Sequence, residues 1–513
     1  MNHFLPTTAA ALFLVLTTIP ALGAGKSEWV SEEGSGKLAY QTLPGGDRVM
    51  DFSHAGYEGG GVALPVAPVK KTLRPSGGDD TAALQAALDE VGRLPVVNGI
   101  RGAVLLEAGE FSCSGALVLK ASGVVLRGSG SGAKGTTINL VGKPHAGVEI
   151  SGGHGNRPSG AAMAITDAYV PSGATTFSVH EAGAFKVGDT ILINHPVTEA
   201  WVKFMQMDEL SRNGKKETWV SGTIACERTI AGISGNKVTV SVPLADAYDA
   251  RYLNPPGATV VKAEGAALIS HVGVEHLRFF APPQKVAFDA PHYSAVRIRA
   301  GADVWLQDLE IVDTVGSVGL DDDTRRATVT GVNIIHTAAT VGSAKPADFS
   351  ADGTQILFDR CSGKGDNLFY FVTGARVTGP NVVLNCTFRG NGHIQPHQRW
   401  ATGLLVDGCK VPESGIDFMN RGEMGSGHGW TLGWGVAWNC EAAEWTIQQP
   451  PGAANWAIGC QGKRVTAARP FDKTPKLPEG IFESHGTPVS PASLYLAQLR
   501  ERLGPQAVKA IGY

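Results

Sequence analysis

The sequence has few charged residues and, after its first residues, no long apolar segment. Aspartate, glutamate, lysine and arginine make up 18% of 513 residues, with a net charge of −3 at pH 7. A chain without a basic excess is not expected to bind nucleic acid, and one without a further long apolar run is not expected to span a membrane. Cys-x-x-Cys pairs are absent, which argues against zinc. Glycine is abundant, at 66 residues without a collagen-like period, which is typical of a turn-rich β protein.

Residues 1–23 are predicted to be a secretory signal peptide. An apolar run from Ala9 to Leu16 is followed by Pro20 and the small-residue stretch Ala21-Leu22-Gly23. This order is that of a cleaved export signal, and the run is too short to anchor the chain in a bilayer. The mature protein is therefore expected in the periplasm or outside the cell, as a monomer.

A short phrase recurs through the second half of the chain. It is an apolar strand that ends in Asp or Asn, and five copies end in cysteine: "ILFDRC", "VVLNC", "LLVDGC", "GVAWNC" and "NWAIGC". The marker residues are Asp308, Asn333, Asp359, Asn385, Asp407 and Asn439, with gaps of 25, 26, 26, 22 and 32 residues.

A period of 20–30 residues indicates a solenoid. A dense leucine frame and a 3.6-residue periodicity are both missing, which argues against leucine-rich and helical repeats. The pattern favours an all-β fold, a right-handed parallel β-helix, in which like residues stack about 4.8 Å apart. The cysteines are then expected to form a buried column of small apolar side chains.

The remaining segments complete the expected domain organisation. Residues 78–91, "GDDTAALQAALDEV", predict an amphipathic helix that caps the first coil. Turns at 186–189 and 235–236 predict an inserted antiparallel β-subdomain that overhangs one face and shapes a cleft. The predicted boundaries are 1–23 signal peptide, 24–100 N-terminal segment with capping helix, 101–165 first coils, 166–262 inserted β-subdomain, 263–465 main coils, and 466–513 C-terminal tail with a helix.

Several N-terminal stretches carry a family resemblance. They are "MDFSHAGYEGGGVALP", the helical segment 78–91, "GAVLLEAGEFSCSGALVL" and "VVLRGSG". Together they resemble the N-terminal module of pectate-lyase-like β-helix proteins, and the resemblance implies a right-handed parallel β-helix that acts on polysaccharide. That superfamily contains lyases, glycoside hydrolases, epimerases and phage tailspikes, so the fold does not fix the reaction. The Ca²⁺-binding aspartates and catalytic arginine of true pectate lyases have no unambiguous counterpart here.

The cysteines serve as a ruler that sets three segments side by side: "HIQPHQRW", "GIDFMNRGEMGSGHGW" and "WTIQQPPG". In this register His397 lies beside Asn420, and Asp417 lies beside Ile394. The candidate catalytic residues are His393, His397, Arg399, Asp417, Arg421 and His428. The candidate substrate-binding residues are Trp400, Asn420, Glu423, Trp430, Gln448 and Gln449. Aromatic platforms with orienting polar groups are common in carbohydrate sites, although a histidine taken alone is more often structural.

A second candidate site is "GLDDDTRR" at 319–326. Asp321, Asp322 and Asp323 offer the oxygen ligands that Ca²⁺ prefers, and the two arginines suit a sugar carboxylate. A solvated acidic turn is the alternative, and is slightly favoured. This turn lies at least two coils from the histidines, where it would serve a more distant subsite.

Three functions remain open, all with a polysaccharide as partner. A uronate lyase acting by β-elimination is ranked first, with Arg399 and Arg421 holding the sugar carboxylate and the histidines moving protons. A glycoside hydrolase would use Asp417 and Glu423 as paired carboxylates. The third is a non-catalytic glycan-binding solenoid. Ca²⁺ is the only cofactor considered.

Overall fold

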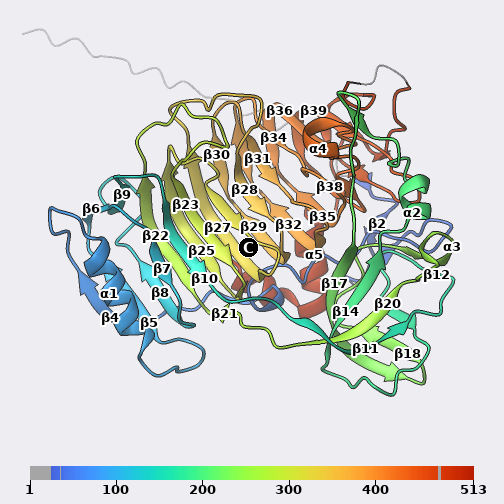
Figure 1. Ribbon diagram of the computed structural model, residues 1–513, viewed down its shortest axis with the longest axis horizontal. Helices are drawn as coiled ribbons and strands as arrows, with labels where there is room; N and C mark the ends of the chain where they lie inside the picture. Colours follow the sequence, from blue (N-terminus) through green and yellow to red (C-terminus); the bar gives the residue numbers. More distant parts are fainter. Residues whose placement is uncertain (1–24, 35, 472–474) are drawn as a thin grey trace, which may run out of the picture.

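The computed structural model describes residues 25–34, 36–471 and 475–513. A single sheet of 29 strands dominates it (Figure 1), and every pairing in this sheet is parallel. The prediction of a mostly β protein with a large parallel sheet is thus confirmed. The predicted signal peptide lies outside the described residues. None of the helices in the described ranges is long and apolar enough to span a membrane.

The strands of the large sheet form three columns, because each strand pairs with its equivalent one coil later. The first column comprises β4 (Val69–Leu73), β5 (Gly102–Leu106), β8 (Val124–Arg127), β22 (Gly273–Phe280), β25 (Trp305–Val312), β27 (Arg325–Ile335), β29 (Thr354–Asp359), β32 (Thr378–Leu384), β35 (Ala401–Asp407), β38 (Val436–Trp438), β40 (Trp456–Ile458) and β42 (Ile481–Glu483). The second comprises β6 (Gly109–Cys113), β9 (Thr136–Leu140), the later halves of β22, β25 and β27, then β30 (Ser362–Lys364), β33 (Thr387–Arg389), β36 (Lys410–Phe418), β39 (Glu441–Ile447) and β41 (Gln461–Arg464). The third comprises β7 (Leu117–Leu119), β10 (Ala146–Ser151), β23 (Ser294–Arg299), β26 (Val318–Leu320), β28 (Ala347–Ala351), β31 (Phe369–Val372), β34 (His393–Ile394) and the later halves of β36 and β39.

An unbroken row of buried apolar residues fixes the register of the third column. Its members are Val296, Val318, Phe349, Phe371, Ile394, Ile416 and Trp445, each paired with the next. A slip by one residue would turn the whole set out of the core. The row therefore determines which neighbouring residues face solvent.

The predicted cysteine column is present. All seven cysteines are buried and unpaired, and the Cys361 amide donates to Cys386 Sγ at 3.4 Å. The residue before each ladder cysteine has a positive φ, namely Arg360, Asn385, Gly408, Asn439 and Gly459. The predicted markers Asn385 and Asn439 are themselves these left-handed residues, whereas at Asp359 and Asp407 the next residue takes the positive φ that redirects the chain between the first and second columns.

Helices close and flank the columns. Helix α1 (Thr81–Gly92) packs Leu84, Leu88 and Val91 against the first coils (Figure 1). Helix α5 (Leu494–Leu503) packs along the flank of the first column, where the Tyr495 amide donates to Asp407 Oδ2 at 2.8 Å, and α6 (Pro505–Ala510) follows it. The C-terminal helix therefore flanks the coils.

The inserted segment is a six-stranded antiparallel sheet that spans 157–264, against the predicted 166–262. In spatial order it contains β11 (Arg157–Ala164), β20 (Thr259–Glu264), β14 (Thr190–Pro196), β17 (Thr223–Ser234), β18 (Lys237–Val240) and β13 (Thr176–Ser178). Smaller elements beside it are β12 (Tyr169–Val170), α2 (Glu199–Phe204), β15 (Ser211–Arg212), β16 (Lys215–Lys216), β19 (Tyr248–Asp249) and α3 (Ala250–Leu253). The chain leaves the coils after β10 and returns before β21 (Ile269–Ser270).

This insert lies beside the later coils (Figure 1). It packs on the turns that join the third column to the first: Trp219 Nε1 donates to the Trp430 carbonyl at 3.1 Å, and Arg228 donates to the Gly379 carbonyl at 2.7 Å. These turns therefore form the floor beneath the insert.

We predict that Asn439→Ala destabilises the fold more than Asn439→Gly does. Asn439 has a φ of 47°, and its amide exchanges hydrogen bonds of 2.8 Å with Val489. Alanine loses both the hydrogen bonds and the tolerance for this φ, a cost of about 2–3 kcal/mol, whereas glycine loses only the hydrogen bonds. Thermal denaturation should rank Tm as wild type, then glycine, then alanine. Equal Tm values for the two variants would contradict a role for the left-handed turn.

Candidate functional site

His393 and Asp417 form a dyad on the outer face of the third column. His393 begins β34, Asp417 lies on β36 one coil later, and His393 Nδ1 is 2.7 Å from Asp417 Oδ2. Gln395 Nε2 donates to the same oxygen at 2.7 Å. The predicted register is off by one, because Ile394 pairs with Ile416 and not with Asp417.

The dyad holds its proton on the histidine. Burial lowers the pKa of His393, but the hydrogen bond to Asp417 and its charge outweigh burial, so that the net shift of the pKa is upward. The His393 side chain is 34% exposed, whereas that of Asp417 is 6% exposed. His393 can therefore exchange a proton with a bound molecule, while Asp417 orients the ring.

The other two predicted histidines, half-buried His397 and buried His428, are neutral. Arg421 Nη1 donates to His397 Nδ1 at 2.9 Å, which leaves the His397 proton on Nε2. Burial and the charge of Arg421 lower the pKa of His397 to about 2, and the same two causes lower that of His428 to about 3. Their rings lie 4.8 Å apart. Neither histidine can act as a cationic acid near neutral pH.

Most of the remaining predicted residues serve the packing of the insert. Trp400, Trp430, Asn420 and Gln448 are at most 2% exposed. Their polar atoms bind within the protein: Trp400 Nε1 donates to Asp246 at 2.8 Å, Trp430 Nε1 to the Met205 carbonyl at 3.0 Å, and Gln448 accepts from the Asn420 amide at 2.7 Å. Trp430, Asn420 and Gln448 thus offer no surface to a substrate, whereas Trp400, together with Gln449, lines a cavity of about 630 Å³ between the insert and the later coils.

The last three predicted residues lie around the same corner. Arg399 donates to Gln398 and Ser426 at 2.7 Å, so its guanidinium is engaged. Gln449 donates to the Ala453 carbonyl. Glu423 is half-buried and precedes the short helix α4 (Met424–Gly427). Asp417 and Glu423 therefore do not face each other as an exposed carboxylate pair, since Asp417 is buried against His393 and Gln395.

A cleft with more charged side chains lies elsewhere, between the insert and the turns that follow the third column. It has a volume of about 520 Å³. Its coil side includes Asp322, Asp323, Arg325, Asp352 and Arg376, and its insert side includes Asn156, Arg157 and Glu227. Asp322, Asp323 and Arg325 of the second predicted site line this cleft. The insert forms its other side, as expected for a subdomain that overhangs one face of the coils.

The carboxylates in and beside this cleft have unlike surroundings. Asp321 accepts hydrogen bonds from the Ala300 amide at 3.0 Å and from Thr324 Oγ1 at 2.8 Å. Burial raises the pKa of Asp352, and the charges of Asp322 and Asp321 raise it further. Asp322 is exposed, and Asp323 lies 3.6 Å from Arg157 across the cleft.

The three consecutive aspartates bind different partners and do not converge. Among the described residues, no group of three histidine, cysteine, aspartate or glutamate side chains is placed to hold a metal ion. The Ca²⁺ site expected at Asp321, Asp322 and Asp323 therefore lacks a converging ligand set. Arg325, which follows them, forms an ion pair with Glu227 of the insert.

Two cleft residues were missed by the sequence reasoning. Asp352 follows β28 at the position that Asp321 holds after β26, because Leu320 pairs with Ala351. The signal was the equivalence of the two strands, but no cysteine marks the register there. Glu227 comes from β17 of the insert, and nothing in its local sequence indicates which coil it faces.

Comparisons with known proteins give no family. No family model and no curated protein matches the sequence. The tailspike protein gp49 of Pseudomonas phage LKA1 is 14% identical with a TM-score of 0.41, over 75% of this chain and 63% of that one, so the chain spans less than two thirds of the tailspike. The A-module of an Azotobacter vinelandii mannuronan C-5 epimerase is 12% identical with a TM-score of 0.26, and the match covers 86% of this chain and 99% of the module. The catalytic domain of a GH87 alpha-1,3-glucanase in complex with nigerose is 9% identical with a TM-score of 0.25, and the match covers 66% of this chain and 93% of that domain. Likeness at this level establishes neither family nor activity, and the pectate-lyase-like assignment stays a prediction.

We predict that Asp417→Asn lowers the pKa of His393. The substitution removes the charge that outweighs burial. Because the folded-state pKa of His393 is raised, its contact with Asp417 stabilises the fold fully below the unfolded value of about 6.5, and this stability is lost as pH rises through the folded pKa. An NMR titration of the His393 ring measures the shift, with His393→Gln identifying the signal. Glu423→Gln is the control and should leave the pKa unchanged, and an unchanged pKa in Asp417→Asn would contradict the dyad.

Proposed function

We propose that the protein is an enzyme that cleaves a polysaccharide by hydrolysing a glycosidic bond in the cleft between the insert and the coils. One observation carries the proposal. Carboxylates from two successive coil turns, Asp322 and Asp352, line one cleft, and one is exposed while the other has a pKa raised by burial. Paired carboxyl groups with unlike environments are what acid–base hydrolysis of a glycoside needs.

In this proposal Asp352 is the general acid. Its raised pKa favours the protonated form, which can give its proton to the glycosidic oxygen as the bond to the anomeric carbon breaks. The ionised Asp322 then takes a proton from the attacking water, whose oxygen bonds to the anomeric carbon. The leaving sugar gains the proton of Asp352, so the step is balanced without a redox partner. Asn194 and Thr378, which also line the cleft, are placed to hydrogen-bond sugar hydroxyls.

The three strand columns support the finer assignment of a right-handed parallel β-helix. Successive turns of such a fold lie about 4.8 Å apart along the axis. A sugar chain laid along the corner between the third and first columns would meet Asp321, Asp352, the turn after Val372 and then the segment before His397, one coil after another. A periplasmic or secreted, monomeric protein remains part of the proposal.

A uronate lyase centred on His393 is the second candidate. The 2.7 Å contact between His393 and Asp417 favours it, since a half-exposed imidazole can move a proton in β-elimination. Such a lyase also needs a cation to neutralise the sugar carboxylate. Arg421 Nη1 donates to His397 and Arg399 Nη2 to Ser426, and neither guanidinium forms a hydrogen bond with His393 or Asp417 in the described part of the chain. The lyase is therefore ranked below hydrolysis, and non-catalytic glycan binding is third.

We predict that Asp352→Asn lowers kcat by about 10²–10⁴-fold, the usual contribution of a general acid. The assay is a polysaccharide panel read for new reducing ends and for the ultraviolet absorbance of an unsaturated uronate. Hydrolysis predicts reducing ends without absorbance. Asp89→Asn, at an exposed carboxylate on α1, is the matched control and should retain full activity.

Absorbance that rises together with reducing ends would contradict hydrolysis. If His393→Gln then removed the activity while Asp352→Asn kept it, the reaction centre would be the dyad. Reducing ends without absorbance from an Asp352→Asn variant with wild-type kcat would instead overturn the assignment of the acid.

A further inference from the structure

A second, smaller cavity adjoins the cleft and is rich in arginine. It has a volume of about 220 Å³ and lies where four parts of the chain meet: the N-terminal segment at His54, the insert at Arg228, the coil turns at Arg326 and helix α5 at Arg502. The cleft and the cavity share three lining residues, Glu227, Arg325 and Thr354. The ion pair of Arg325 with Glu227 therefore stands where cleft and cavity join.

The cavity carries more positive than negative charge. Four arginines line it, Arg228, Arg325, Arg326 and Arg502, against two glutamates, Glu58 and Glu227. Arg326 is held by Asp303 through two hydrogen bonds of 2.7 and 2.6 Å. Burial, and then the charge of Arg326, lower the pKa of Arg325 to about 10, which shows that the cations crowd one another.

Arg228 and Arg502 have no carboxylate in contact. Arg228 is 3% exposed and donates to the carbonyls of Pro243 at 2.9 Å and Gly379 at 2.7 Å. Arg502 donates to Ser53 Oγ at 2.7 Å and to the Gly59 carbonyl at 2.8 Å. Within the described residues neither forms a salt bridge, and carbonyl oxygens satisfy hydrogen bonds without neutralising a charge. Arg228 is thus a buried cation with no carboxylate in contact, and half-buried Arg502 has the charge of Asp51 nearby without an ion pair to it. A further anion in the cavity would stabilise both guanidiniums.

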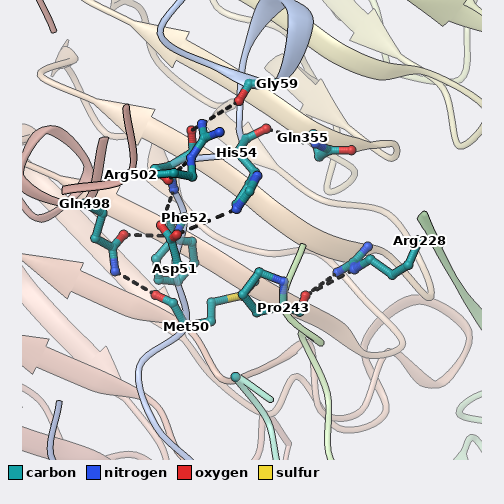
Figure 2. A network of polar contacts seen from close by, with 12 residues as sticks. Met50, Asp51, Phe52, His54, Gly59, Arg228, Pro243, Gln355, Gln498 and Arg502 are labelled. Atoms are coloured by element: carbon teal, nitrogen blue, oxygen red, sulfur yellow. Dashed lines mark hydrogen bonds and ion pairs between the residues drawn. The ribbon is translucent and has the colours of Figure 1, made fainter. Parts of the chain in front are cut away.

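Neutral donors complete the lining. His54 lines the cavity with the arginines, and Figure 2 shows it next to Arg502, with its Nε2 3.7 Å from Asp51 Oδ2, while Arg228 donates to the Pro243 carbonyl. Burial, Arg502 and Arg228 lower the pKa of His54 to about 3, so the ring stays neutral and keeps one N–H to donate. Gln355 donates to the His54 carbonyl at 3.0 Å and fixes its backbone. Thr354 Oγ1 is buried and has no hydrogen-bond partner among the described residues.

We infer that this cavity binds the oxyanion substituent of an acidic polysaccharide, a carboxylate or a sulfate ester, while the sugar ring that carries it lies in the adjoining cleft. The cavity has room for one charged group and not for a second sugar chain, and guanidiniums are the preferred partners of such groups. The inference rests on the proposed function, because the cleft is what brings the substituent to the cavity. It names the substrate class: a glycan with negative charge on the residue next to the cleaved bond.

Calorimetric titration of the full chain tests this with three small probes at matched ionic strength. They are methyl glucuronide, methyl glucoside 6-sulfate and uncharged methyl glucoside. We expect saturable binding of at least one anionic probe and none of the neutral one, and the stronger anionic probe identifies the substituent. Arg502→Gln should weaken anion binding at least tenfold. Arg389→Gln removes an exposed arginine from β33 and should leave affinity unchanged.

A second variant guards against loss of folding in Arg502→Gln. Thr354→Glu places a carboxylate at the junction of cavity and cleft, where it should abolish anion binding and raise Tm by partly neutralising the arginines. A wild-type protein that binds no anionic probe would overturn the inference, as would equal anion affinity in wild type and Thr354→Glu. Asp352→Asn separates the two proposals. If this variant keeps its activity and still binds the anionic probe, only the reaction assignment fails. If the variant loses its activity and the wild-type protein binds no anionic probe, only the cavity assignment fails.

Discussion

The stacking of one apolar side chain upon the next in the third column sets the position of every candidate site residue. Val318, Phe349, Phe371 and Ile394 occupy one row in the core. With that row fixed, the residues that follow each strand must leave the column at the same corner. Asp321, Asp352, the turn after Val372 and the segment before His397 therefore follow one another along this corner, although 76 residues separate Asp321 from His397 along the chain. Chemistry at this corner is a consequence of core packing.

The insert turns that corner into a cleft, and aromatic side chains attach it. Trp201 stacks on Trp219 with ring centroids 5.0 Å apart, and both contact Trp400 of the coils at 5.9 Å. Asp246 accepts from Trp400 and Trp434. Trp400 and Trp430, which the sequence suggested as sugar-binding platforms, instead contact Trp219 of the insert.

The sequence predicted the structure best where a repeated sequence pattern corresponds to residues in the same position of successive coils. The Asp or Asn that recurs at the end of each apolar strand indicated a repeat, and the cysteines indicated a buried column, so the mostly β parallel architecture was within reach. The register of the third column could not be predicted from the sequence. Coil lengths vary, and the cysteines mark only the start of the second column. A one-residue error placed Asp417 beside Ile394, although it lies beside Gln395. Glu227 and Arg228 were out of reach because a chain segment of more than 100 residues brings them back to the coils, and no local pattern specifies where it docks.

In the proposed complex, substrate lies between the insert and the coils, with its scissile bond at Asp352 and a charged substituent toward Arg502. The most direct measurement is a crystal structure of Asp352→Asn soaked with an acidic oligosaccharide from the polysaccharide that the enzyme cleaves. The account predicts sugar density along Asp322 and Asp352, with the oxyanion within hydrogen-bond distance of Arg502 or His54. Density over His393 on the outer face of the third column, with the cleft unoccupied, would contradict it.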